Sequence, residues 1–300
     1  MAKKGLERRE FLLAAVCTAA GGLESFAGEN LIARFGMVTD IHYAVKKDGY
    51  DWPGNRCFTQ SPEKLRDCVK TMNSLKVDFL IELGDFKDQC RTKEETLQCL
   101  EKIEKEFSLF NGPRYHALGN HDMDIITKAE FFSRISNTGQ KTPKGYYSFT
   151  VGKMSYVVLD PNYTSKGLDY ANGNFNWTDA NIPDHEIKWL EGVLKNAPGD
   201  VVVFSHQLVD PTCPDAVRIK NAALLREMFE KSGKVKAVFT GHHHNGHGVV
   251  HNGIFYYTLR ALVKNRYPEN NSYAEVSMYD SGRIVVKGFA KAASADSKTA

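Results

Sequence analysis

Five short apolar runs along the chain predict the strands of a buried sheet. They cover residues 35–38, 79–83, 115–118, 201–204 and 235–239. Each run is closed by a glycine or a polar residue, which is the pattern of a strand that is covered on both faces. Such strands need helices or a second sheet on either side, so the pattern indicates a layered α/β protein.

The segments between these runs predict the remaining elements. Ser61 and Pro62 are a suitable N-cap and first-turn proline for a helix to about residue 75. Apolar spacing predicts further helices over 92–110, 187–194 with Asp184 as its cap, and 222–229. Residues 146–150 and 155–159 predict a hairpin, and three more strands are expected over 254–258, 273–278 and 284–288. This order suggests two sheets packed face to face with helices outside.

Polar side chains follow all five buried strands at the point where each strand ends. They are Asp40-Ile41-His42, Gly84-Asp85, Gly119-Asn120-His121-Asp122, His206 and Gly241-His242-His243-His244. Ligands of open α/β sheets gather at the carboxyl ends of the strands. Carboxylate and amide oxygens mixed with imidazoles, without a thiolate, suit Mn, Fe or Zn in an open reactive site.

Each of these motifs alone is weak evidence for a metal site. A single Asp-x-His pair is equally consistent with loop hydrogen bonds, and a single buried histidine is more often a core residue. The five motifs occur together at strand exits, which favours a shared centre. Residues two apart in extended chain point the same way, so Asp40 and His42 can face one ion, as can His242 and His244. His243 then points away and is not expected to be a ligand.

The ordered set Asp-x-His, Gly-Asp, Gly-Asn-His-Asp, His and Gly-His-x-His resembles the calcineurin-like metallophosphoesterase superfamily from about residue 35 to 244. Its spacing is most similar to the manganese-dependent ADP-ribose/CDP-alcohol diphosphatase branch, many members of which carry Gln where this chain has His42. The resemblance implies a four-layer α/β sandwich of two face-to-face mixed β-sheets flanked by helices.

The resemblance also implies roles for seven residues. One metal ion would be held by Asp40, His42, Asp85 and His244, and Asp85 would bridge to a second ion held by Asn120, His206 and His242. Two such ions can activate a bridging hydroxide for attack on phosphorus and clamp the transition state.

A proton for the departing oxygen remains to be supplied. His121 is the expected general acid and Asp122 its orienting residue, since a carboxylate fixes an imidazole and raises its pKa. The alternative is that His121 only braces Asn120.

The expected activity is therefore hydrolysis of small phosphoesters or nucleotide-type diphosphates. A phosphomonoesterase and a non-catalytic relic of the fold are the alternatives, and the His-x-His-x-Asp-His run of metallo-β-lactamases is absent. Aromatic residues in the loops 43–60 and 161–183 are placed either to stack on a substrate or to anchor those loops. Arg56, in the first loop, is a candidate for binding a second phosphate or a carboxylate.

Residues 1–27 have the order of an export signal. A basic start with Arg8-Arg9 precedes the apolar stretch 11–20, and small residues follow up to Ala27. Arg8-Arg9-Glu10-Phe11-Leu12 resembles the bacterial twin-arginine signal. We expect cleavage after Ala27 by way of the twin-arginine export machinery and a periplasmic or extracellular location. A cytoplasmic location is the alternative if this segment is an ordinary amphipathic terminus. At about ten residues, the stretch is too short for a stable membrane anchor.

Composition adds little to this picture. The chain has 300 residues and a formal net charge of +3, which fits one large domain over 28–290 with an Ala/Ser/Lys-rich tail over 291–300 that is expected to be disordered. Basic residues are dispersed, so nucleic acid is not an expected partner. Without Cys17 an odd number of cysteines remains, and at least one free thiol is expected. A bridge between Cys57 and Cys68, or between Cys90 and Cys99, is open in an oxidising compartment.

Overall fold

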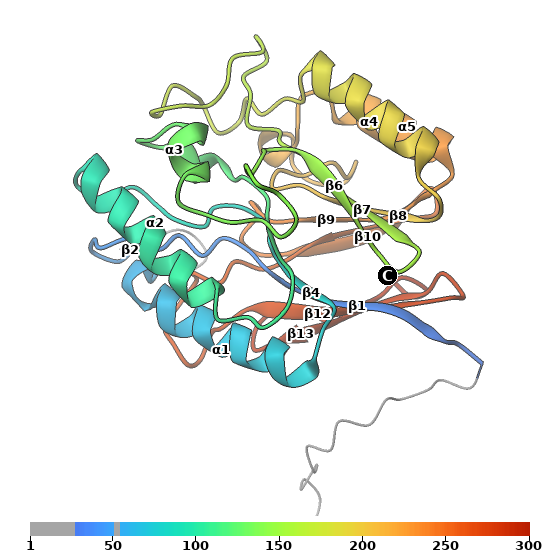
Figure 1. The fold of residues 1–300 in the computed structure, drawn as a ribbon, viewed down its shortest axis with the longest axis horizontal. Helices are drawn as coiled ribbons and strands as arrows, with labels where there is room; N and C mark the ends of the chain where they lie inside the picture. The colour runs from blue at the N-terminus through green and yellow to red at the C-terminus, as the bar shows by residue number, and fades with distance from the viewer. Residues whose placement is uncertain (1–27, 51–54) are drawn as a thin grey trace, which may run out of the picture.

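The computed structural model describes residues 28–50 and 55–300, so the predicted export signal lies outside the described residues. Two six-stranded sheets face each other (Figure 1). The first has the order β14-β13-β12-β1-β4-β5 and the second the order β10-β11-β9-β8-β7-β6, while β2 and β3 form a separate pair. Both six-stranded sheets mix parallel and antiparallel pairs. The predicted fold class is confirmed.

The strands of the first sheet are β1 (Leu31–Val38), β4 (Phe79–Glu82), β5 (Arg114–His116), β12 (Tyr273–Tyr279), β13 (Ile284–Phe289) and β14 (Ala295–Asp296). Those of the second are β6 (Tyr147–Val151), β7 (Met154–Val158), β8 (Val201–Phe204), β9 (Val235–Thr240), β10 (His247–His251) and β11 (Ile254–Thr258). The small pair is β2 (Gly49–Tyr50) and β3 (Asn55–Arg56). The helices are α1 (Ser61–Leu75), α2 (Lys93–Phe107), α3 (Lys128–Phe132), α4 (Asp184–Asn196) and α5 (Ala222–Ser232).

The core between the sheets is aromatic. Phe35 of β1 stacks on Phe79 of β4 with ring centroids 4.8 Å apart, and its edge meets Phe204 of β8 and Phe239 of β9. These four rings are fully buried. They pack the two sheets against each other directly below the strand ends, which gives the loops that follow a rigid base.

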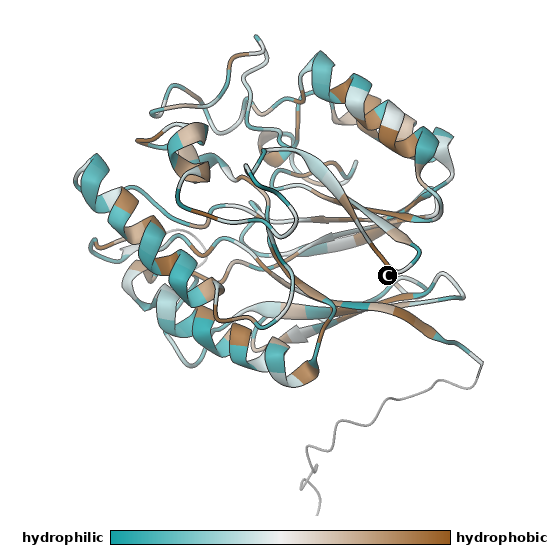
Figure 2. Ribbon diagram, viewed as in Figure 1, coloured by the Kyte–Doolittle hydropathy of each residue, from teal (hydrophilic) through white to brown (hydrophobic). Residues whose placement is uncertain are grey.

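Helices cover the outer faces of both sheets. Helices α1 and α2 pack on the first sheet and α4 and α5 on the second, each turning its hydrophobic stripe inward (Figures 1 and 2). Helix α2 begins at Lys93 after the N-cap Thr92, whose side chain accepts a hydrogen bond from Glu95 N at 3.2 Å. None of the helices among the described residues is long and apolar enough to cross a membrane.

The structure corrects three local predictions. Ser61 is not an N-cap, because it is the first residue of α1 and its Oγ donates to Ile41 O at 2.5 Å. Asp184 does not cap α4 either, since Pro183 occupies that position. The tail predicted to be disordered instead returns to the sheet: β14 pairs with β13, and Arg283, which precedes β13, donates from its Nε to the Asp296 carboxylate at 2.9 Å.

Candidate metal centre

Parallel pairing brings the five polar motifs to one edge of the sandwich. Strands β1, β4 and β5 are parallel to one another, and so are β7, β8, β9 and β11 in the other sheet. The carboxyl ends of β1, β4, β5, β8 and β9 lead directly into the motifs at Asp40, Asp85, Asn120, His206 and His242. Side chains far apart in the sequence therefore meet above the aromatic core.

Among the described residues, three groups of ligand-type side chains lie in this place; one consists of His42, Asp88 and His121, and the other two consist only of predicted ligands. Of these two, Asp40, His42 and His244 form one group, and Asp85, His206 and His242 form the other; within each group the ligand atoms lie within 4.8 Å of one another. Oδ1 of Asp40 is 3.1 Å from Nε2 of His244. The two groups correspond to the two ion sites that the sequence resemblance implies.

Asp85 lies between the groups. Its Oδ2 is 3.5 Å from Nε2 of His42 and 3.2 Å from Nε2 of His206. Its Oδ1 accepts a hydrogen bond from the His121 backbone N at 2.7 Å, which fixes the carboxylate. One carboxylate oxygen thus faces ligands of both groups, as a bridging role requires.

Several of these ligand atoms have no hydrogen-bond partner among the described residues although they are buried. They are Asp40 Oδ1, Asn120 Oδ1, His206 Nε2 and His242 Nε2. Buried polar atoms are almost always paired, so four orphans converging on one place need another partner. Metal ions fit this need, because each orphan is an oxygen or imidazole nitrogen with a free lone pair.

The backbone of this site adopts conformations that are rare for residues with a side chain. Asp40, His42, Asp85 and His242 all have positive φ, between 47° and 64°. Each such residue costs free energy, on the order of 1 kcal/mol. The neighbouring Gly119 is required by crowding, since a Cβ there would lie 2.1 Å from Asp85 N. The aromatic core and the surrounding hydrogen bonds hold these loops in place.

Partners behind the histidines orient their rings. Nδ1 of His206 donates to Leu83 O at 2.8 Å, which leaves Nε2 free toward Asp85. Nδ1 of His42 lies 3.3 Å from Oδ2 of Asp88. Asp88 was not among the residues predicted from the sequence, where its only signal is its position three residues after Asp85. A carboxylate behind a ligating histidine fixes the tautomer and strengthens the ligand.

The charges of the site favour bound cations. Burial alone would lower the pKa of His206, but the carboxylates of Asp85 and Asp40 outweigh it and raise this pKa to about 10. Burial lowers the pKa of His242 to about 3, assisted by the positive charge of His206. The carboxylates therefore favour positive charge at this place. Divalent cations would balance the same charge while all the imidazoles act as neutral ligands.

The predicted orienting residue of His121 was wrong. Oδ2 of Asp124, not Asp122, lies 2.8 Å from Nδ1 of His121. Asp122 turns inward and accepts hydrogen bonds from the backbone N of Gly119, at 2.8 Å, and of Asp85, at 3.1 Å. Asp122 thus joins the loop after β4 to the loop after β5, and the contact of Asp124 with Nδ1 leaves Nε2 of His121 available for the predicted role of proton donor.

We expect Asp124→Asn to move the alkaline limit of activity to lower pH. Burial alone would lower the pKa of His121, but Asp85, Asp124 and Asp88 raise it to about 9. Metal cations would act against this rise. The protonated ring gives the proton, so activity is present below this pKa and is lost above it. Without the Asp124 charge the pKa falls, by about one unit for a partner at this distance. A kcat–pH profile measures the shift.

Glu130→Gln is the matched control for Asp124→Asn. Glu130 is a nearby carboxylate whose partners are Thr127 and Lys93. Its profile should match that of the wild-type protein. An unchanged alkaline limb in Asp124→Asn would show that Asp124 does not set the protonation of His121.

A cavity of about 320 Å³ opens onto the two groups. Its lining includes Asp85, Asn120, His121, Arg56, Trp177, Val217, Asn245 and the three histidines 242–244. Nη1 of Arg56 lies 3.8 Å from Oδ2 of Asp88, which places its positive charge at the rim. His243 also lines the cavity, but it does not belong to either group.

The aromatic residues of the loop 161–183 differ in where they lie. Tyr170 is fully buried and stacks on Phe175 with ring centroids 4.1 Å apart, so it anchors the loop. Trp177 is 47% exposed, and its ring lies 5.7 Å from that of His242. It is therefore available to a substrate that enters the cavity.

Comparison with known proteins gives consistent results. The model of the calcineurin-like phosphoesterase family matches residues 33–246. Manganese-dependent ADP-ribose/CDP-alcohol diphosphatases from Oryza sativa and Arabidopsis thaliana are 26% and 27% identical, over 84% and 82% of this chain and 90% and 91% of theirs. The crystal structure of a dimetal phosphatase from Danio rerio superposes with a TM-score of 0.78 at 19% sequence identity. The matched region covers 89% of this chain and 99% of the Danio rerio chain.

Proposed function

This chain belongs to the calcineurin-like phosphoesterase family, and from that premise we propose that it hydrolyses the diphosphate bond of small nucleoside-diphosphate-linked compounds. The reaction class is that of a metal-dependent phosphohydrolase with two divalent ions. The observation that supports the finer proposal is the cavity, where Arg56 and the exposed Trp177 lie beside the two ligand groups. A phosphomonoester needs neither of them.

The first ion site would be formed by Asp40, His42 and His244 and the second by Asn120, His206 and His242, with Asp85 between them. Two divalent ions held there supply Lewis acidity toward a phosphoryl group and make water nucleophilic near neutral pH. Manganese is the ion named for the relatives, and the mixed oxygen and imidazole donors suit it, as they suit iron and zinc.

Residues of the chain would supply the proton for the leaving group and bind the substrate. His121, with Nδ1 held by Asp124, presents Nε2–H to the oxygen that leaves phosphorus. Arg56 would bind the second phosphate by charge-assisted hydrogen bonds. Trp177, whose ring lies 5.7 Å from that of His242, would cover the base or sugar. Together they fix the diphosphate with one phosphorus at the ligand groups and the other at the arginine.

A substrate panel tests this proposal. The protein, loaded in turn with Mn, Fe or Zn, is assayed on ADP-ribose, a CDP-alcohol, bis-p-nitrophenyl phosphate and p-nitrophenyl phosphate. We expect kcat/KM to be highest for the two diphosphates with manganese. A preference for p-nitrophenyl phosphate would favour the phosphomonoesterase alternative, and no turnover with any metal would favour a non-catalytic relic.

Arg56→Ala should raise KM for ADP-ribose about 10–100-fold, because one charged hydrogen-bonding partner contributes about 1.5–3 kcal/mol. Its kcat/KM for p-nitrophenyl phosphate, which has no second phosphate, should change little. Lys46→Ala is the matched control: Lys46 Nζ also contacts Asp88, at 2.7 Å, but does not line the cavity. Equal losses on both substrates in Arg56→Ala would contradict a role in binding the second phosphate.

A further inference from the structure

Two buried cysteines lie next to each other, close to the loops that follow β1 and β4 and carry candidate metal ligands. Cys90 follows β4 and its loop, five positions after Asp85, and Cys99 lies in α2. Their Sγ atoms are 3.2 Å apart, and each residue is 4% exposed. Both are free thiols in the structure, as are Cys57, Cys68 and Cys213.

From this juxtaposition we propose that Cys90 and Cys99 are a reversible oxidation site, whose disulfide ties the metal loop after β4 to α2. A disulfide needs its sulfurs about 2.05 Å apart. The two thiols must therefore approach by only about 1 Å, a movement within reach of side-chain rotation and small backbone shifts.

The backbone around Cys90 is already held in position for this bond. Cys90 N donates to Oγ1 of Thr96, one turn before Cys99, at 3.0 Å. Thr96 Oγ1 in turn donates to Thr92 O at 2.8 Å, at the start of the helix. The loop and the helix that the bond would join are thus fixed to each other by a separate contact.

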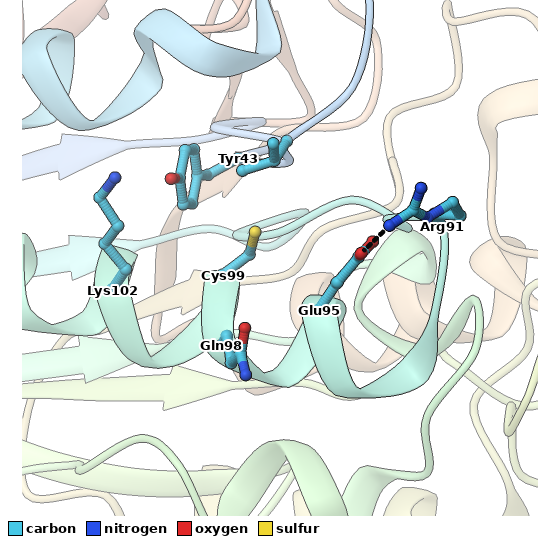
Figure 3. A pocket seen from close by; sticks show the side chains of 7 residues that line it. Tyr43, Arg91, Glu95, Gln98, Cys99 and Lys102 are labelled. Carbon is cyan, nitrogen blue, oxygen red and sulfur yellow. Dashed lines mark hydrogen bonds and ion pairs between the residues drawn. The ribbon is translucent and has the colours of Figure 1, made fainter.

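An oxidant can reach the pair from the surface. Cys99 lines a cavity of about 500 Å³ together with Tyr43, Val45 and residues of α2 (Figure 3). In that view the Cys99 side chain points from α2 toward Tyr43. The cavity has room for one end of a small disulfide such as oxidised glutathione. It is separate from the one at the metal centre, which has other lining residues.

A small disulfide of this kind can oxidise the two cysteines by thiol–disulfide exchange. The Cys99 thiolate attacks one sulfur of the oxidant, which breaks the oxidant's S–S bond, forms a mixed disulfide and releases one thiol. The Cys90 thiolate then attacks the Cys99 sulfur and releases the second thiol. The protein loses two electrons and two protons, and the oxidant becomes two thiols. Before the exchange, the hydrogen bond between the two thiols lowers the pKa of Cys90 and raises that of Cys99, so the first step requires the Cys99 proton to leave.

The pair is connected to the metal centre on two sides. Cys90 comes two residues after Asp88, the carboxylate behind His42. Cys90 Sγ also accepts a hydrogen bond from Val45 N at 3.4 Å, in the loop that follows His42. Oxidation would therefore restrain both loops, and opening of the metal site would become rarer.

The test compares the oxidised and reduced forms of the same full-length protein. After equilibration with oxidised glutathione and quenching with a maleimide, mass spectrometry of a non-reduced digest should find a peptide that joins Cys90 to Cys99. The unfolded protein should have lost two titratable thiols. Release of manganese to a chelator should be about 5–10-fold slower in the oxidised form, and Tm should be about 5 °C higher. Both changes should reverse with a reducing agent.

Variants exclude other cysteine pairs. Cys99→Ser should abolish the linked peptide and the difference between oxidised and reduced protein, whereas Cys68→Ser, also buried, should retain both. Absence of the Cys90 to Cys99 peptide, or its replacement by one joining Cys57 to Cys68, would overturn the proposal. A linked protein that releases manganese as fast as the reduced one would overturn the connection to the metal loops.

Discussion

Asp85→Ala is expected to abolish hydrolysis, with a loss of at least about 10⁴-fold in kcat/KM, and to remove bound metal at the same time. Its Oδ2 faces histidines of both groups, at 3.5 Å from His42 and 3.2 Å from His206. Loss of this oxygen weakens both ion sites and removes the charge that balances the histidines. Metal content by elemental analysis and kcat/KM with manganese in excess measure the two effects.

The substitution must be separated from loss of the fold. Asp85 has φ of 58°, a conformation that alanine adopts less readily than aspartate or asparagine. Asp85→Asn keeps the shape and an oxygen that can accept from His121 N, so it should fold like the wild-type protein and still lose metal and activity. Asp124→Asn, which removes a carboxylate outside both ligand groups, should retain both ions. An active, fully loaded Asp85→Ala would contradict the two-metal centre.

The fold and the convergence of the candidate ligands at one edge could be predicted because they depend on patterns that are local in the sequence. Short apolar runs mark the buried strands, and polar residues at their ends mark the edge where parallel strands finish. No contact between distant residues has to be known for this step. The strand before Asp40 and the one before His206 belong to different sheets, yet both ends were located from their own sequence alone.

The partner of His121 could not be predicted in the same way. Asn120–Met123 forms a 3₁₀ turn, and the direction of each side chain there depends on which distant groups need a partner. The unpaired backbone N–H groups of Gly119 and Asp85 draw the Asp122 carboxylate inward. Asp124, beyond the turn, is then left to meet the ring. Adjacency in the sequence favoured Asp122 as the partner of His121. The backbone hydrogen bonds hold Asp122 elsewhere, and Asp124 is the residue that contacts the ring.

Tertiary contacts likewise explain the role of Asp88 and the ordered tail. Asp88 is recognised only when the loops after β1 and β4 lie side by side, where it meets His42 at 3.3 Å. The composition of residues 291–300 favours disorder, but the edge of β13 offers unpaired backbone groups to β14. Arg283 adds an ion pair to Asp296. The local hydrophobic pattern of the sequence does not predict any of these contacts.

His121→Ala should reduce kcat by about 10²–10⁴-fold for a phosphoester with an alkyl alcohol as leaving group. The departing alkoxide is strongly basic and needs the proton from Nε2, whereas p-nitrophenolate is a weak base and leaves without it. For p-nitrophenyl esters the loss should therefore be small, less than about fivefold. Rates for a series of alkyl and aryl esters, in the wild-type and variant proteins, measure how the loss depends on the leaving group.

This dependence separates the general acid from the alternative in which His121 only braces Asn120. A bracing residue acts through the second ion site, so its removal would slow all esters by a similar factor and lower the metal content. His121 contacts Asp85 by its backbone N and directs its ring to Asp124 and Asp88, and the ring also meets that of His42 with centroids 4.8 Å apart. Alanine keeps that backbone contact. A uniform loss across the series, together with loss of metal, would therefore remove His121 from the proton-transfer step.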